Sequence, residues 1–130
     1  MKEKQVVRTE AAPAPFQGAP YSQAISAGGL VFISGQLGLA SGETTLEGKS
    51  IEAQTRQVLE NIKAILEEAG SGLGSLLKTT VFLADLADFA AMNAVYSDFV
   101  GEVPPARATV QVAALPSGAL VEIDAVALVD

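Results

Sequence analysis

Arg107 and Glu122 are the two residues whose types and surroundings point most directly to chemistry. Arg107 lies in the apolar run 104–112, and Glu122 lies fifteen positions further on, in the apolar run 120–128. Burying a guanidinium without compensation is costly, so Arg107 must pair with a carboxylate, reach solvent or bind an anionic ligand. The third option would make Arg107 a binding residue.

The alternation of side chains along a strand assigns these residues to faces. In an extended chain, Arg107 and Thr109 share one face, and Glu122 and Asp124 share a face that the apolar residues around them do not. The segment 115–118 reads Leu-Pro-Ser-Gly and predicts a turn. We therefore expect the two runs to pair as antiparallel strands with Arg107 near Glu122. An ordinary cross-strand ion pair without function is the alternative.

Length and composition limit the class of protein. The 130 residues are 49% hydrophobic, which predicts one domain over residues 1–130 with a partly flexible segment at 1–14. The net charge of −7 disfavours nucleic-acid binding, which draws on clustered Lys and Arg. No apolar stretch of membrane-spanning length and no signal-peptide pattern is present in the sequence, so we expect a cytoplasmic protein that does not bind membranes.

The sequence contains neither cysteine nor histidine. A disulfide, a thiolate nucleophile, a Ser-His-Asp triad and an imidazole metal ligand are therefore all excluded. No acidic loop with calcium-site spacing is present either, so we expect no metal site.

Hydrophobic periodicity predicts strands and helices in the order β-β-α-β-α-β-β, with a possible short extra strand at 36–39. The predicted elements are strands at 21–27 and 30–39 joined at Gly28-Gly29, a helix at 51–69 capped by Ser50, a strand at 76–84, a helix capped by Asp88 that ends at Gly101, and strands within 104–112 and 120–128. This order favours a single mixed sheet with both helices on one face. The strands are apolar at nearly every position, so we expect another subunit to cover the other face. Gly35, inside the second strand, indicates a bulge or a close approach.

Seven segments, taken together, resemble one known family in order and spacing. They are 19–23 (APYSQ), 34–36 (SGQ), 61–70 (NIKAILEEAG), 78–83 (KTTVFL), 93–96 (NAVY), 105–107 (PAR) and 121–125 (VEIDA). The family is the Rid family, also called the YjgF/YER057c/UK114 family, and the resemblance covers nearly the whole chain.

The resemblance implies a chorismate-mutase-like α/β fold, assembled as a homotrimer with a barrel of sheets inside and clefts between subunits. It also implies a hydrolase similar to 2-iminobutanoate/2-iminopropanoate deaminase. Such an enzyme converts reactive enamines and imines, such as 2-aminoacrylate, to 2-oxo acids and ammonia. No cofactor is needed for that chemistry.

The resemblance also assigns roles to individual residues. Arg107 would bind the substrate carboxylate through its planar fork, assisted by the backbone N–H of Gly35. Glu122 would hold the attacking water and exchange protons with it, and the main chain at Thr109 would help to place that water. Three further residues would line the cleft, namely Tyr21, Ser34 and Asn93. The part of the cleft wall that holds Tyr21 could belong to the neighbouring subunit.

Two other functions are compatible with parts of this pattern. A trimeric regulatory protein could use the Arg107 cleft to sense 2-oxo acids or other small carboxylates without turnover. The ribonuclease or translation-inhibitor activity attributed to some relatives fits poorly with the net charge of −7 and the absence of histidine. Each residue also has an ordinary structural interpretation; Asn93, for example, suits a solvent-facing helix position.

Overall fold

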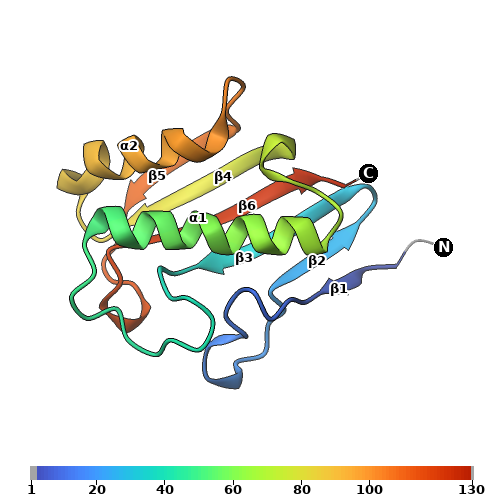
Figure 1. Ribbon diagram of the computed structural model, residues 1–130, viewed down its shortest axis with the longest axis horizontal. Coiled ribbons are helices and arrows are strands. Elements are labelled where there is room, and N and C mark those ends of the chain that lie inside the picture. Colours follow the sequence, from blue (N-terminus) through green and yellow to red (C-terminus); the bar gives the residue numbers. More distant parts are fainter. Residues whose placement is uncertain (1–2, 130) are drawn as a thin grey trace.

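The computed structural model describes residues 3–129, so the prediction for the first residues of segment 1–14 lies partly outside the described residues. The elements are β1 (Gln5–Val7), β2 (Ala24–Ala27), β3 (Leu30–Gln36), α1 (Ile51–Glu68), β4 (Leu76–Leu83), α2 (Phe89–Val100), β5 (Ala106–Gln111) and β6 (Val121–Leu128). The strands form one sheet in the order β1-β2-β3-β6-β4-β5 (Figure 1). The expected mixed α/β fold is confirmed.

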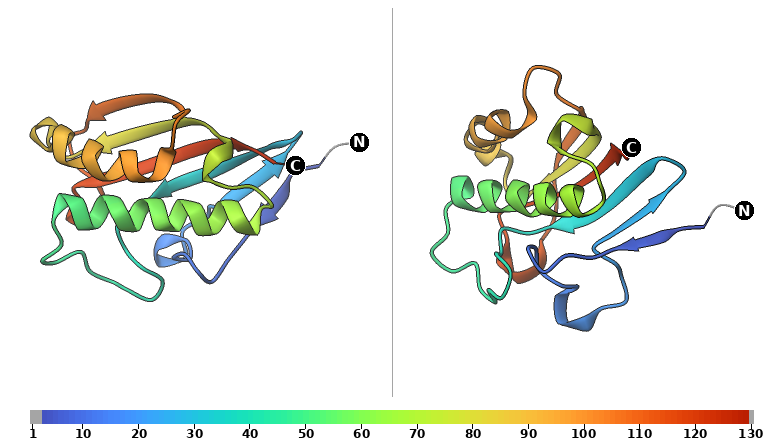
Figure 2. Two further views of the ribbon diagram at one scale, coloured as in Figure 1. Left: turned by 45° about the horizontal axis from the view of Figure 1, so that its top comes forward. Right: turned by 45° about the vertical axis from the view of Figure 1, so that its right-hand side comes forward.

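Both helices cover the same face of the sheet, as the two rotated views in Figure 2 show. Helix α1 begins where expected, because the Ser50 hydroxyl oxygen accepts the Ala53 N–H at 3.1 Å. Its buried stripe, which includes Val58, Ile62 and Leu66, packs into the main core over β3 and β6. The predicted cap of α2 is wrong in detail, since Asp88 occupies the cap position without a side-chain hydrogen bond. Asp85 instead accepts the Ala87 N–H in the short turn before it.

The central part of the sheet is the hairpin of β2 and β3, with β6 lying between β3 and β4. Gly28 and Gly29 join β2 to β3 with φ values of 59° and 81°, a turn that matches the right-handed twist of the strands. Strand β3 pairs antiparallel with β6, and the pairing shifts between Ile33 and Gln36. The bulge expected around Gly35 is therefore present, whereas β3 ends at Gln36 and no separate strand follows at 36–39.

Strand β1 was not predicted from the sequence. It pairs antiparallel with β2, and the segment that follows it is fixed by Gln23, whose buried side chain bonds to several backbone groups of residues 9–13. This fixed segment leads into Tyr21, so its path determines one wall of the site described below.

The face of the sheet opposite the helices carries exposed apolar side chains. Phe32, Val110 and Leu128 are each between 41% and 49% exposed there, and each alternates with residues that face the helices. Monomers seldom expose so many large apolar groups on one sheet face. This surface is the one on which the sequence predicts a second subunit, and that assembly remains a prediction.

Candidate active site

Glu122 lies directly against Gly35 on the open face of the sheet. Val121 and Ile123 on either side of Glu122 are fully buried beneath the helices, so the Glu122 side chain projects from the other face. The bulge in β3 brings Gly35 beside it, and a Cβ built on Gly35 would stand only 2.8 Å from the carboxylate carbon of Glu122. A residue with any side chain at position 35 would therefore displace Glu122.

The Glu122 carboxylate opens into a hollow of about 390 Å³ with a mainly apolar lining, formed by Phe16, Ala19, Tyr21, Ser34, Gly35, Leu37, Pro116 and Glu122. Burial raises the pKa of Glu122 above its ordinary value, and the negative charge of Asp124 raises that pKa further. A carboxyl group with a raised pKa can take up and release a proton nearer to neutral pH. The hollow therefore holds a candidate acid and base.

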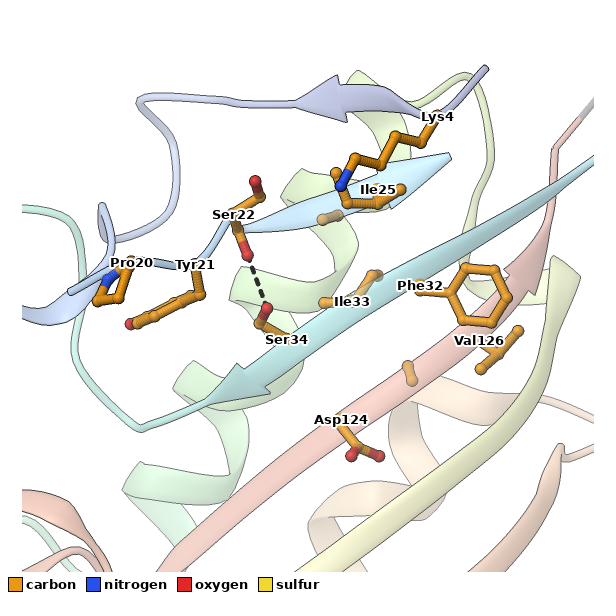
Figure 3. A pocket seen from close by; sticks show the side chains of 12 residues that line it. Lys4, Pro20, Tyr21, Ser22, Ile25, Phe32, Ile33, Ser34, Asp124 and Val126 are labelled. Carbon is orange, nitrogen blue, oxygen red and sulfur yellow. Dashed lines mark hydrogen bonds between the residues drawn. The ribbon is translucent and has the colours of Figure 1, made fainter. Parts of the chain in front are cut away.

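Tyr21 and Ser34 stand between this hollow and a second one. The second hollow, of about 550 Å³, runs over the open sheet face from Tyr21 to Phe32 and Val126. Figure 3 shows the Ser34 hydroxyl in the hydrogen bond that it donates to the Ser22 carbonyl oxygen at 2.6 Å. The Tyr21 hydroxyl accepts the Phe16 backbone N–H at 2.7 Å, so its own proton can be donated elsewhere.

Arg107 lies on the other side of the sheet, beneath α2. It pairs in register with Thr79 of β4, which is fully buried on the helix side. The guanidinium carbon stands 4.8 Å from the ring centroid of Tyr96 and 5.6 Å from that of Phe89. Within residues 3–129, no carboxylate comes within ion-pair distance of this guanidinium. Its hydrogen-bonding edge is therefore not engaged by a counter-ion from the described part of the chain.

Asn93 and Thr109 belong to the same side as Arg107. Asn93 is four residues after Phe89 and three before Tyr96, so it shares the face of α2 that contacts Arg107. Its side-chain oxygen is buried and lacks a hydrogen-bond partner among the described residues. Buried oxygens without a hydrogen-bond donor are uncommon, so the Asn93 side-chain oxygen is a candidate acceptor for a ligand N–H or O–H.

The predicted pairing of Arg107 with Glu122 is wrong. Strand β4 lies between β5 and β6, pairs parallel with β5 and antiparallel with β6, and so separates the two residues. Residues that pair across strands share a face, and Arg107 and Thr79 face the helices while Glu122 faces away from them. The candidate site residues therefore form two groups within one chain. Tyr21, Ser34, Gly35 and Glu122 form the first group, and Asn93, Arg107 and Thr109 form the second.

Sequence reasoning missed the residues that shape the rim of the Glu122 hollow. Phe16 and Pro116 each begin a short 3-10 turn whose next residue has a positive φ, namely Gln17 at 53° and Ser117 at 58°. Such left-handed positions are strained for residues other than glycine and tend to occur near functional sites. In both turns a glycine follows the residue with positive φ, Gly18 in one and Gly118 in the other, and this glycine was the sequence signal that could have indicated the turns.

The described part of the chain offers neither a metal site nor a membrane-spanning helix. No group of three or more metal-ligating side chains occurs among residues 3–129. Neither α1 nor α2 is long and apolar enough to cross a membrane.

Comparison with known proteins is consistent across sequence and structure. The family model described as endoribonuclease L-PSP matches residues 9–129. A RutC family protein of Pyrococcus horikoshii is 51% identical over 124 residues, which cover 95% of this chain and 97% of that protein. The Reactive Intermediate Deaminase A of Arabidopsis thaliana is 49% identical over 125 residues, covering 96% of this chain and 66% of the plant protein. That relative is named as chloroplastic, so family membership does not by itself imply a cytoplasmic location.

The fold comparison agrees with the sequence comparison. The crystal structure of RidA from an Antarctic Psychrobacter species superposes with a TM-score of 0.90 at 46% identity, covering 96% of this chain and 99% of the other. The family model and these relatives extend over both groups of candidate site residues. The chain therefore belongs to the Rid family.

Proposed function

We propose that this protein hydrolyses reactive enamines and imines derived from amino acids, such as 2-aminoacrylate, to 2-oxo acids and ammonia. The observation that carries the proposal is that the Arg107 guanidinium has no counter-ion among residues 3–129, in a chain that also holds a half-buried carboxyl group with a raised pKa, at Glu122. A 2-imino acid needs one cation for its carboxylate and one proton carrier for its reacting carbon. Family membership and the relative named as a reactive intermediate deaminase support the same kind of reaction.

The active site in this proposal is shared between subunits. One chain places Arg107 and Glu122 on opposite faces of its sheet, so it does not bring them to one ligand. A homotrimer with clefts between subunits would set the Arg107 group of one chain beside the Glu122 group of its neighbour. The exposed apolar face of the sheet offers the surface for that assembly.

Arg107 acts in this mechanism as the carboxylate clamp. The guanidinium presents two parallel N–H groups, which match the two oxygens of a carboxylate. The backbone N–H of Gly35 would assist from the neighbouring chain, and the unpartnered oxygen of Asn93 would accept an N–H from the imine. Fixing the carboxylate places the C=N carbon at a defined point in the cleft.

Glu122 acts as the proton carrier. The enamine first tautomerises to the imine, and an ionised Glu122 then takes a proton from water as the oxygen bonds to the C=N carbon. The resulting carbinolamine receives that proton on nitrogen. Glu122 then transfers the hydroxyl proton to the same nitrogen as the C=O bond forms, the C–N bond breaks and ammonia leaves. Water is consumed, no electron is transferred, and the carboxylate is regenerated. The main chain at Thr109 and the hydroxyl groups of Tyr21 and Ser34 would orient the water and the ligand.

Ribonuclease activity is a second candidate because of the description that the family model carries. The net charge of −7 and the absence of histidine weigh against it, since phosphate binding draws on clustered cations and many ribonucleases use imidazole. A ligand sensor for 2-oxo acids is a third candidate and would also use Arg107.

The test is the release of ammonia and 2-oxo acid after 2-aminoacrylate is generated in situ, with Arg107→Ala as the control. Acceleration by the intact protein that disappears in the variant is the expected result. Failure of the intact protein to accelerate hydrolysis of this substrate and of a larger 2-imino acid would overturn the proposal. Cleavage of single-stranded RNA that persists in Arg107→Ala would favour the nuclease instead.

The variant Glu122→Gln separates the enzyme from the sensor. The amide keeps the shape of the side chain but cannot exchange a proton, so turnover should be lost while 2-oxo acid binding persists. Unchanged turnover in this variant would contradict the role assigned to Glu122.

A further inference from the structure

No ion pair with a carboxylate among residues 3–129 holds the Arg107 side chain, which raises the question of what positions it. An arginine side chain has many rotamers, and a mobile guanidinium would lose rotamer entropy at each binding event. The guanidinium instead lies over the rings of Tyr96 and Phe89. These rings have no role in the reaction proposed above.

Tyr96 is itself firmly fixed. Tyr96 is only 5% exposed, and its hydroxyl lies 2.7 Å from the hydroxyl of Thr79, a fully buried residue of β4. Thr79 is also the residue of β4 that pairs with Arg107 of β5. The hydrogen bond between Thr79 and Tyr96 therefore joins β4 to α2, and the Tyr96 ring on α2 faces the Arg107 guanidinium on β5.

An aromatic ring and a carboxylate hold a guanidinium in different ways. A carboxylate occupies the N–H groups at the edge of the fork, which are the groups that a substrate carboxylate needs. The face of a ring attracts the cation through its quadrupole and leaves those N–H groups available. Tyr96, at 4.8 Å, and Phe89, at 5.6 Å, are within the range of this attraction. They differ in that Phe89 is 42% exposed and carries no hydroxyl anchor.

We propose that Tyr96, anchored by Thr79, is a positioning residue that holds the Arg107 guanidinium in place for carboxylate binding. The inference rests on the proposed function, because it concerns the carboxylate clamp of that site. Its rival is that Tyr96 is simply a buried core residue whose loss would loosen α2. The experiment therefore has to separate lost clamping from lost stability.

The test measures pyruvate binding by isothermal titration calorimetry, together with kcat and KM for in situ 2-aminoacrylate. Tyr96→Leu removes the ring and should weaken pyruvate binding and raise KM by about 2- to 30-fold, the range of a cation–π contact. Tyr96→Phe and Thr79→Val keep the ring but release it, so each should weaken binding less than Tyr96→Leu does. The double variant should bind pyruvate no more weakly than the weaker-binding single variant, because both substitutions break the same hydrogen bond.

Two controls distinguish clamping from a general loss of structure. Val95→Ala creates a cavity at a buried position of the same helix and should leave pyruvate affinity near that of the intact protein. In an Arg107→Ala background, Tyr96→Leu should cause no further loss of binding. A Tyr96→Leu effect of equal size in both backgrounds would overturn the inference, as would unchanged affinity in Tyr96→Leu.

The outcomes also separate this inference from the proposed function. If the intact protein neither binds pyruvate nor hydrolyses 2-aminoacrylate, the proposed function fails and the clamp fails with it. If the intact protein does both and the Tyr96 variants match it, only the inference fails. Should Tyr96→Leu not fold, Tyr96→Phe and Thr79→Val still decide the question, and pyruvate affinity at the level of the intact protein in both would reject the anchor.

Discussion

The carboxylate of Glu122 lies so close to the main chain of Gly35 that no side chain fits between them. The bulge in β3 creates this contact, because it turns Gly35 toward β6 at the level of the hollow. A glycine at this position thus serves the placement of Glu122 rather than a special backbone angle, since its φ is not positive.

Gly35→Ala should therefore displace Glu122. The new methyl group would meet the carboxylate, and we expect turnover of 2-aminoacrylate to fall at least about tenfold with a loss of stability of about 1–3 kcal/mol. Gly72→Ala is the matched control, because a Cβ at Gly72 would meet no atom within 4 Å and its φ of −169° suits any residue. Equal activity in the two variants, measured by ammonia release, would show that the Glu122 position is not critical.

The raised pKa of Glu122 predicts a dependence of activity on pH. Turnover needs the ionised carboxylate, so the acid limb of the kcat/KM profile should lie above the ordinary glutamate value of 4.5. Asp124 contributes to raising this pKa, and Asp124→Asn should move the acid limb toward lower pH. A limb that moves upward in Asp124→Asn would contradict the assignment.

The same raised pKa predicts a dependence of stability on pH. The folded state binds the Glu122 proton more tightly than the unfolded state does, so stability falls as pH rises from the unfolded value through the raised folded value. Glu122→Gln removes this penalty, and we expect it to unfold at a higher denaturant concentration than the intact protein at neutral pH. The two proteins should converge below pH of about 4. Urea titrations at several pH values would measure this difference.

Arg107→Lys tests whether geometry or charge alone binds the carboxylate. Lysine keeps the positive charge but loses the two parallel N–H groups, so we expect the KM for 2-aminoacrylate to rise about tenfold or more while the fold is kept. Arg107→Ala should bind pyruvate more weakly still. A lysine variant with the KM of the intact protein would show that a point charge is sufficient.

Asn61 should matter for stability and for the path of the chain after β3. Its buried amide donates to the carbonyl oxygens of Leu37 and Leu39, at 3.1 and 2.8 Å. Asn61→Ala leaves both carbonyls without this donor and should cost about 1–3 kcal/mol in urea-induced unfolding. Gln57→Ala removes only the 2.9 Å hydrogen bond that Gln57 donates to the Asn61 oxygen, so it should cost clearly less.

The sequence predicted individual elements well because local patterns determine them. Ser50 caps α1, the double glycine turns β2 into β3, and the alternation around Glu122 sets its face, all as expected. Strand β1 escaped prediction because three residues carry too little periodicity to be recognised.

The sequence did not predict that β5 and β6 are separated by another strand. Segments 104–112 and 120–128 have the pattern of a hairpin. The end of β4, however, is hydrogen-bonded both to the end of the first segment and to the start of the second. Val112 N–H donates to the Leu83 carbonyl, and Ala84 N–H donates to the Leu120 carbonyl. Because β4 lies between β5 and β6, Arg107 lies beneath α2. Strand patterns alone could therefore not predict that its guanidinium faces the rings of Tyr96 and Phe89.

The separation of Arg107 and Glu122 on two faces of one chain has a genetic consequence. If neighbouring chains share each site, a cell with one gene copy encoding Arg107→Ala and another encoding Glu122→Gln would make mixed trimers in which about one cleft in four has both native residues. Each allele alone would be null, and the pair would complement. Without complementation, both residues would have to act from the same polypeptide, and two recessive lesions in this gene would behave as a single defect.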